Sequence, residues 1–250
     1  MTETSASAAP VALITGAARR IGATITQTLH DAGYDVAIHY RTSAAEAESL
    51  AAKLESRRAD STLLLQADLA DTKALPDLVE NTLSRFGRLD ALVNNASGFR
   101  PTPVGEISEA DWDELFAANA KAPLFLSQAA APALRESTGA IVNIVDIYAE
   151  RPLANHPVYC MAKAALAMLT RSLARDLGPE VRVNGVSPGA ILWPEDGSIY
   201  TDQQAMIERT PLQRTGNPQD IADAVLWLLR NARYSTGEII RVDGGRTLVI

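Results

Sequence analysis

The chain has 250 residues, of which 47% are hydrophobic, and its formal net charge is −7. This length fits one large α/β domain or two small ones, and no polar block separates two halves. A negative net charge argues against a nucleic-acid partner, for which a basic face is expected. Cys160 is the only cysteine. An intrachain disulfide and a cysteine-rich metal site are therefore excluded, and the scattered histidines give no metal triad.

Residues 1–9, MTETSASAA, lack the basic start and the apolar core of a secretory signal. We expect them to form a flexible tail ahead of a single domain over residues 10–250. No apolar run reaches the ~18 residues that a membrane-spanning helix needs. The expectation is a soluble, cytoplasmic protein without a membrane partner.

The first predicted strand, Val11–Thr15, runs directly into a glycine turn and a helical pattern over Ile21–Ala32. Such a junction presents backbone N–H groups and the positive end of a helix dipole to an anion, so a pyrophosphate fits there. The alternative is that Gly16 and Gly22 serve only the dihedral angles of the turn. The strand and helix that flank the turn favour cofactor binding.

The second strand, Asp35–Tyr40, ends in Arg41-Thr42-Ser43 rather than in an acid. An acid at this point would bind the ribose 2′-hydroxyl of NAD, whereas arginine suits the 2′-phosphate of NADP. Arg19 of the glycine turn can approach the same place. NADPH is therefore the predicted cofactor, and the alternative is that both arginines are solvated surface residues.

The third and fourth strands, Thr62–Ala67 and Leu89–Val93, bracket a helix over Leu78–Phe86. Asp68 follows the third strand, where one possible local role is the N-cap of a helix from Asp71 onward. Small residues follow the fourth strand, where a backbone that skirts a cofactor needs them. Phe99 lies in the next loop, where it either anchors the loop or stacks on a flat substrate.

A strand over Ala140–Val145 ends in Asp146, and a helix from near His156 to Leu177 carries Tyr159 and Lys163. Residues four apart share a helix face, so the phenol and the ammonium can point into one pocket. A nearby cation lowers the phenol pKa from its reference of about 10, as a general acid or base requires. An ordinary exposed helix pair is the alternative.

The remaining elements are strands over Val181–Val186 and Glu238–Val242 and a helix over Ile221–Leu229. Between them, residues 194–209 are polar and weakly patterned, which is typical of a lid over a substrate, and we place this lid at about residues 190–212. Trp193 either walls the pocket or pins this lid. The alternation of strands and helices predicts one doubly wound, Rossmann-type α/β domain with a seven-stranded parallel sheet.

Several motifs in this order resemble the short-chain dehydrogenase/reductase family along essentially the whole chain. They are TGAARRIG, Asn94-Asn95-Ala96-Ser97, Asn119, Tyr159 with Lys163, Pro188-Gly189, and Val242-Asp243-Gly244-Gly245. The resemblance implies that Asn119, in a helical region over Asp111–Ala131, holds a water linked to Lys163. It also implies an adenine contact for Asp68 and a homotetramer. Arg20 stands where the family usually has glycine, and Ser97 replaces another common glycine.

Within that family, TGAARRIG, NNASGFRPTP, Asp146 and GAILWPE look most like the pteridine reductases. Most of the family has serine where this chain has Asp146, and an ionised carboxylate cannot donate a hydrogen bond to a ketone oxygen. It would also raise the pKa of the phenol, against the effect of Lys163. A cap at the strand end is the alternative role for this acid.

The predicted reaction is NADPH-dependent reduction of a C=N bond in a dihydropterin or dihydrofolate-type ring to the tetrahydro form, with a small-molecule pteridine as partner. One alternative is a carbonyl reductase of the 3-oxoacyl thioester or sugar-alcohol type, and another is a non-catalytic NADPH-binding sensor.

The predicted catalytic residues are Asp146, Tyr159, Lys163 and Asn119. The predicted cofactor-binding residues are Gly16, Arg19, Arg20, Ile21, Gly22, Tyr40, Arg41, Thr42, Ser43, Asp68, Leu69, Asn94, Ala96, Ser97, Tyr159, Lys163, Pro188, Gly189 and Ile191. The predicted substrate-binding residues are Arg20, Ser97, Phe99, Asp146, Tyr159, Leu192 and Trp193.

Overall fold

The structure, a computed structural model, describes residues 9–192 and 203–250, and its centre is one parallel sheet. The seven strands lie in the order β3-β2-β1-β4-β5-β6-β7. The order reverses between β1 and β4, and ligands bind at such a point, outside the carboxyl ends of the strands. The predicted fold class is confirmed. The strands are β1 Val11–Ile14, β2 Asp35–Tyr40, β3 Thr62–Gln66, β4 Ala91–Asn94, β5 Ala140–Ile144, β6 Arg182–Pro188 and β7 Ile239–Val242.

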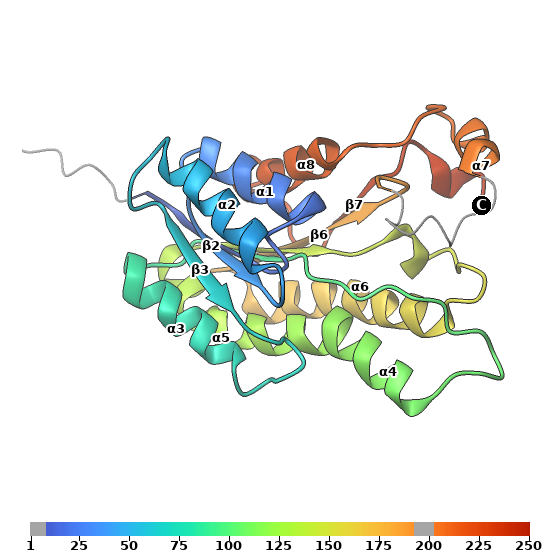
Figure 1. Ribbon diagram of the computed structural model, residues 1–250, viewed down its shortest axis with the longest axis horizontal. Helices are drawn as coiled ribbons and strands as arrows, with labels where there is room; N and C mark the ends of the chain where they lie inside the picture. Colours follow the sequence, from blue (N-terminus) through green and yellow to red (C-terminus); the bar gives the residue numbers. More distant parts are fainter. Residues whose placement is uncertain (1–8, 193–202) are drawn as a thin grey trace, which may run out of the picture.

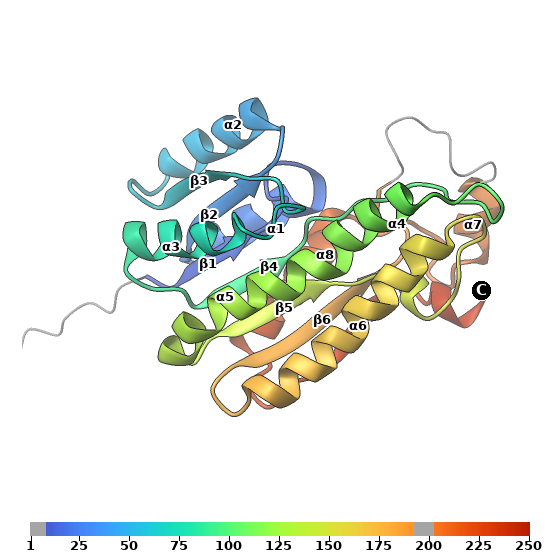
Figure 2. The same ribbon diagram turned by 90° about the horizontal axis from the view of Figure 1, so that it is seen from below.

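Helices cover both faces of the sheet (Figure 1). Helices α1 (Arg20–Asp31), α2 (Ala44–Glu55) and α8 (Pro218–Arg230) lie on one face. The other face, seen in Figure 2, carries α3 (Leu75–Phe86), α4 (Glu109–Phe116), α5 (Ala122–Ser137) and α6 (Pro157–Leu177). Each layer encloses its own apolar cluster, with Ile25 and Val225 in one and Leu78 and Leu126 in the other. Burial of both faces explains why the central strands are apolar throughout rather than alternating.

The helical region expected over Asp111–Ala131 is longer and is not uniform. It begins with α4, which Ser108 caps by accepting a hydrogen bond from the Asp111 N–H. A π-helical turn, Ala117–Lys121, then joins α4 to α5. Such turns inside α-helices occur frequently at functional sites, and this one contains Asn119.

Part of the expected lid is helical, because α7 spans Gln203–Arg209. The weak apolar pattern of this stretch concealed the helix. Trp193 and most of the N-terminal tail lie outside the described residues. Within residues 9–192 and 203–250, no helix is both long and apolar enough to cross a membrane.

Candidate active site

Two adjoining cavities open at the carboxyl ends of the strands. The first, which we call the turn cavity, has a volume of about 410 Å³ and lies among the glycine turn, the end of β2 and the loop after β4. The second, the tyrosine cavity, has about 300 Å³ and contains Tyr159. Four residues line both cavities and join them into one cleft: Arg20, Ile21, Asn95 and Ser97.

An acid, a phenol and an ammonium meet in the tyrosine cavity. The Tyr159 hydroxyl donates a hydrogen bond of 2.7 Å to Oδ2 of Asp146, and the Tyr148 N–H donates one of 2.9 Å to Oδ1. Lys163 Nζ lies 5.8 Å from the centre of the Tyr159 ring and donates 2.9 Å to the Ile144 carbonyl. The acid therefore lies two residues after β5, and the last carbonyl of β5 accepts the hydrogen bond from the lysine. Helix α6 supplies the phenol and the lysine, one turn apart.

Burial favours the neutral forms of Asp146 and Lys163 and shifts the two pKa values in opposite directions. It raises the pKa of Asp146, although the Tyr148 N–H, the Tyr159 hydroxyl and Lys163 oppose the shift. Burial lowers the pKa of Lys163 from 10.5 to about 8, and Asp146 opposes it. Each group stabilises the charge of the other, and burial moves their two pKa values toward each other.

Asn119 does not line either cavity, and its side chain is completely buried. Its amide group donates 2.9 Å to the carbonyls of Gly98 and Leu115, and its Oδ1 accepts 2.7 Å from the Ser97 hydroxyl. These contacts hold the loop after β4 against α4. The polar atoms of the Asn119 side chain are therefore bonded to Ser97, Gly98 and Leu115, and its expected water link to Lys163 stays a prediction.

The Phe99 ring lines the tyrosine cavity and is also packed into its surroundings. It stacks on His156 with a centroid distance of 4.8 Å and an interplanar angle of 14°. It meets the Tyr159 ring edge-on, at 4.8 Å and 82°. Both interpretations of Phe99 are thus compatible, since the loop anchor is at the same time a flat wall beside the phenol.

The glycine turn packs tightly beneath the cleft. Gly16 has a φ of +60°, and a Cβ there would lie 2.9 Å from Ala96 Cα. A Cβ on Gly22 would lie 2.1 Å from the Gly16 carbonyl oxygen. The first helical hydrogen bond of α1 joins Ala23 N to Arg19 O. The N–H groups of Ile21 and Gly22 come before it, as in other helix N-termini that bind anions.

Arg20 has a φ of +52°, a left-handed conformation that costs a non-glycine residue about 1–2 kcal/mol. This explains why glycine suits the position. The guanidinium Nη2 approaches the Leu192 carbonyl at 3.5 Å, across the mouth of the tyrosine cavity. The strained residue therefore lies where the two cavities join.

The far end of the turn cavity is basic and hydroxylic. Residues 40–43 line it together with Arg19, which pairs with Glu46 at 3.8 Å. Asp68 and Leu69 also line this cavity, and Asp68 Oδ1 accepts 2.9 Å from the Ala70 N–H. Asp68 thus shapes a local turn, and it does not cap α3, which begins only at Leu75.

Asn94 was predicted to bind the cofactor, but its side chain is buried and turned away from both cavities. It donates 2.8 Å to Asn143 Oδ1. Asn95 lines both cavities instead, and its amide donates 2.8 Å and 3.0 Å to the carbonyls of Thr15 and Gly16. The pair of asparagines was visible in the sequence, but only the position at which β4 ends decides which one faces the cleft.

Other lining residues were missed by sequence reasoning. They carry no motif of their own, because the meeting of distant segments brings them to the cleft. They are Ala18, His39, Ala70, Gly98, Glu114, Ala117 and Ala118 in the turn cavity and Ile144, Val145, Tyr148 and Ala190 in the tyrosine cavity.

The Pro188-Gly189 pair and the Asp243 turn contact each other. Gly189 N–H donates 3.0 Å to the Val242 carbonyl, and a Cβ on Gly189 would lie 2.7 Å from Asp243 Cα. Two motifs far apart in the sequence therefore depend on one close backbone approach. Ile191 and Leu192, which follow Pro188-Gly189, line the tyrosine cavity.

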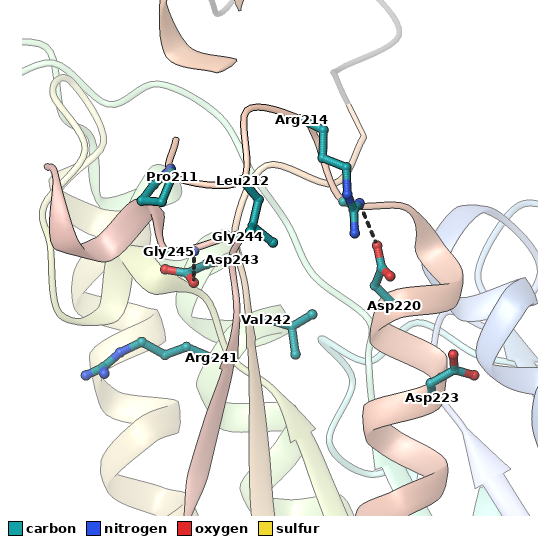
Figure 3. Close-up of a pocket in the computed structure, with 11 residues that line it drawn as sticks. Pro211, Leu212, Arg214, Asp220, Asp223, Arg241, Val242, Asp243, Gly244 and Gly245 are labelled. Atoms are coloured by element: carbon teal, nitrogen blue, oxygen red, sulfur yellow. Dashed lines mark hydrogen bonds and ion pairs between the residues drawn. The ribbon is translucent and has the colours of Figure 1, made fainter. Parts of the chain in front are cut away.

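A third cavity of about 580 Å³ lies beside β7 and is lined by the Asp243 turn and the start of α8 (Figure 3). Arg214 and Asp220 form an ion pair of 3.3 Å in it. It contains no tyrosine, lysine, histidine or cysteine among its described lining residues. The described parts of the chain also hold no cluster of three potential metal ligands. Of these three cavities, the tyrosine cavity is the one whose described lining brings an acid, a phenol and an ammonium together.

Comparison with known proteins gives a family model and several relatives of nearly full length. The model described as Enoyl-(Acyl carrier protein) reductase matches residues 16–247. Pteridine reductase 1 of Leishmania tarentolae is 39% identical, over 98% of this chain and 99% of that protein. A putative ketoacyl reductase 2 of the granaticin polyketide synthase from Streptomyces violaceoruber is 36% identical, over 98% and 99%. The 3-oxoacyl-[acyl-carrier-protein] reductase FabG of Staphylococcus aureus is 34% identical, over 94% and 96%.

Proposed function

This chain belongs to the short-chain dehydrogenase/reductase family, and we propose that it is an NADPH-dependent pteridine reductase. The observation that carries the proposal is the 2.7 Å hydrogen bond from Tyr159 to Asp146 beside the Phe99 ring. A ketone substrate needs a donor at the position of Asp146, and loss of one such donor typically costs about 100-fold or more in rate. A nitrogen heterocycle offers N–H groups that a carboxylate can accept.

The turn cavity suits a phosphorylated dinucleotide. The N-terminus of α1 offers N–H groups to a pyrophosphate, and residues 40–43 with Arg19 offer a cation and hydroxyls to a 2′-phosphate. Asp68 and Leu69 would border the adenine. Reduced nicotinamide, when bound, supplies the hydride for a ring carbon of the substrate.

The protein's own part is the proton. Tyr159 donates its hydroxyl proton to the ring nitrogen next to the reduced carbon, while Lys163 stabilises the phenolate that forms. Asp146, once it has taken up a proton from solvent, returns that proton to the phenolate along their 2.7 Å hydrogen bond, a role that the upward shift of its pKa by burial favours. Arg20, Ser97 and Leu192 border the substrate ring, and Phe99 stacks on it.

Parallel assays of NADPH oxidation with dihydrobiopterin, dihydrofolate and an acetoacetyl thioester test the proposal. We expect turnover of at least one of the two pteridines. Asp146→Ser should lower that rate by about 100-fold. Asp146→Asn is the matched control for a proton relay, because it keeps a hydrogen-bond acceptor for Tyr159 but has no proton to return. Full activity of Asp146→Asn would show that the acid only orients the phenol.

A carbonyl reductase is the second candidate, and the similarity to ketoacyl and 3-oxoacyl reductases at 36% and 34% identity supports it. Turnover of the acetoacetyl thioester alone would establish this candidate against the pteridine proposal. Turnover of none of the three substrates, with NADPH still bound, would favour a sensor.

We also propose that the protein is a cytoplasmic homotetramer. Large apolar side chains lie exposed on α4 and α6, with Trp112 at 41% and Met168 at 59% exposure. Burial of such side chains between subunits would remove them from water. Light scattering after size exclusion tests the assembly, and a monomer of 26.7 kDa would contradict it.

A further inference from the structure

His39 is a buried residue of β2 that contacts the glycine turn and the end of β3. Its ring Nδ1 lies 3.1 Å from the Gly16 nitrogen, and its Nε2 lies 3.2 Å from the Ala67 carbonyl oxygen. A backbone N–H can only donate and a carbonyl can only accept. The contacts therefore require a neutral ring with its proton on Nε2, so that Nδ1 accepts from Gly16 and Nε2 donates to Ala67.

The backbone polar groups of Gly16 and Ala17 form hydrogen bonds to other parts of the protein. The Ala17 N–H donates 2.8 Å to the main-chain carbonyl of His39, while Asn95 donates 3.0 Å to the Gly16 carbonyl. Ala96 packs against Gly16 on the side where a Cβ would collide. The Gly16 and Ala17 amides thus face β2, and an anion in the cleft meets the amides at the start of α1 instead.

The two contacts require an uncharged His39 ring, and the ring is uncharged at pH 7. The His39 residue is 2% exposed. Burial lowers its pKa from 6.5 to about 4, although the Ala67 carbonyl and Asp68 oppose the shift. Nδ1 therefore remains an acceptor for Gly16 throughout the pH range in which a neutral-pH reductase works.

We propose that His39 is a positioning residue for the dinucleotide cofactor. Its Nδ1 holds the Gly16 peptide in the orientation that aims the N-terminus of α1 at the pyrophosphate. His39 acts through Gly16 and is not itself a catalytic residue. The inference rests on dinucleotide binding in the turn cavity and not on the pteridine as substrate.

Three substitutions separate the two ring nitrogens. In His39→Asn, Oδ1 replaces Nδ1 as an acceptor for Gly16, but the donor to Ala67 is lost. In His39→Gln, the amide nitrogen reaches the position of Nε2 and keeps the Ala67 contact, but no acceptor stands at the δ position. His39→Leu removes both contacts. The dissociation constant of NADPH, measured by fluorescence titration, and the melting temperature are determined for each variant.

We expect NADPH affinity to follow the acceptor at the δ position. His39→Asn should bind within about threefold of the wild type. His39→Gln and His39→Leu should bind about tenfold more weakly, because the Gly16 N–H loses its partner. Equal weakening of His39→Asn and His39→Gln, or wild-type binding by His39→Gln, would overturn the proposal. That comparison remains decisive if His39→Leu fails to fold.

A fragment without a pyrophosphate separates positioning from general disturbance. Binding of 2′-AMP uses only the far end of the turn cavity, so His39→Gln should change it by less than about twofold. An equal loss for NADPH and 2′-AMP would show a general structural role and overturn the proposal. If the wild type binds NADH and not NADPH, the proposed cofactor is wrong, and the same variants measured with NADH and AMP still decide the role of His39.

Discussion

Burial of the Lys163 ammonium lowers the stability of the folded protein by an amount that follows from the shift in its pKa. The residue is 2% exposed, and its pKa falls from 10.5 to about 8. The shift, 10.5 − 8, is about 2.5 units. At 1.36 kcal/mol per unit, the buried ammonium lowers the stability of the folded protein by roughly 3 kcal/mol at pH 7. Removal of the charge should therefore make the folded protein more stable at pH 7 and should also abolish most of its activity.

Lys163→Met keeps the length of the side chain and removes the charge. Because the folded pKa is below the unfolded one, stability is present above pH 10.5 and is lost as the pH falls through about 8. The hydrogen bond to Ile144, worth about 1–3 kcal/mol, is lost at every pH and cancels when two pH values are compared. Relative to the wild type, the variant should therefore gain roughly 2–3 kcal/mol at pH 7 compared with pH 10.

Urea unfolding of the cofactor-free protein at pH 7 and pH 10 measures this difference. Lys121→Met is the matched control, since it also removes a lysine charge, but from an exposed side chain on the π turn. The reasoning is refuted if Lys163→Met changes the free energy of unfolding equally at both pH values. The same variant should reduce kcat at pH 7 by about 100-fold or more.

Substitutions at three further residues test other parts of the site. The free energy of unfolding of Arg20→Gly, measured in urea, should be about 1 kcal/mol higher than that of Arg20→Ala, because only glycine relieves the left-handed strain. Equal free energies of unfolding for the two variants would contradict that strain. Both should raise the KM for the pteridine about tenfold in steady-state assays; an unchanged KM would remove Arg20 from the substrate site. Arg41→Asp should shift the ratio of kcat/KM from NADPH toward NADH by at least about tenfold, and an unchanged ratio would place the 2′-phosphate elsewhere. Phe99→Leu should raise the pteridine KM about fivefold with little change for an acetoacetyl thioester, whereas equal changes would assign Phe99 to loop packing.

The local parts of the site could be predicted from the sequence. Tyr159 and Lys163 share a face because helical spacing requires it, and Gly16 and Gly22 mark a turn because no other residue fits there. The acid after β5 follows from an apolar run that ends in Asp146. The alternation of strands with helices was likewise sufficient for the doubly wound sheet.

Other parts depend on contacts between distant segments, and no local pattern encodes them. Asn95 rather than Asn94 faces the cleft because of where β4 ends, and the Asn119 amide is occupied because the loop after β4 packs on it. His39 looks like any buried strand residue until the glycine turn is placed against it.

The sequence by itself determined the fold class, because strands and helices alternate along the chain. It also determined the tyrosine–lysine pair on α6 and the place of the glycine turn, because spacing along one helix or one turn defines each of them. Only the tertiary structure decided which side chains hold those groups in position. Whether a polar side chain at a strand end turns toward the cleft or into the core depends on the register of the sheet and on the segments packed against it, which lie far away in the chain.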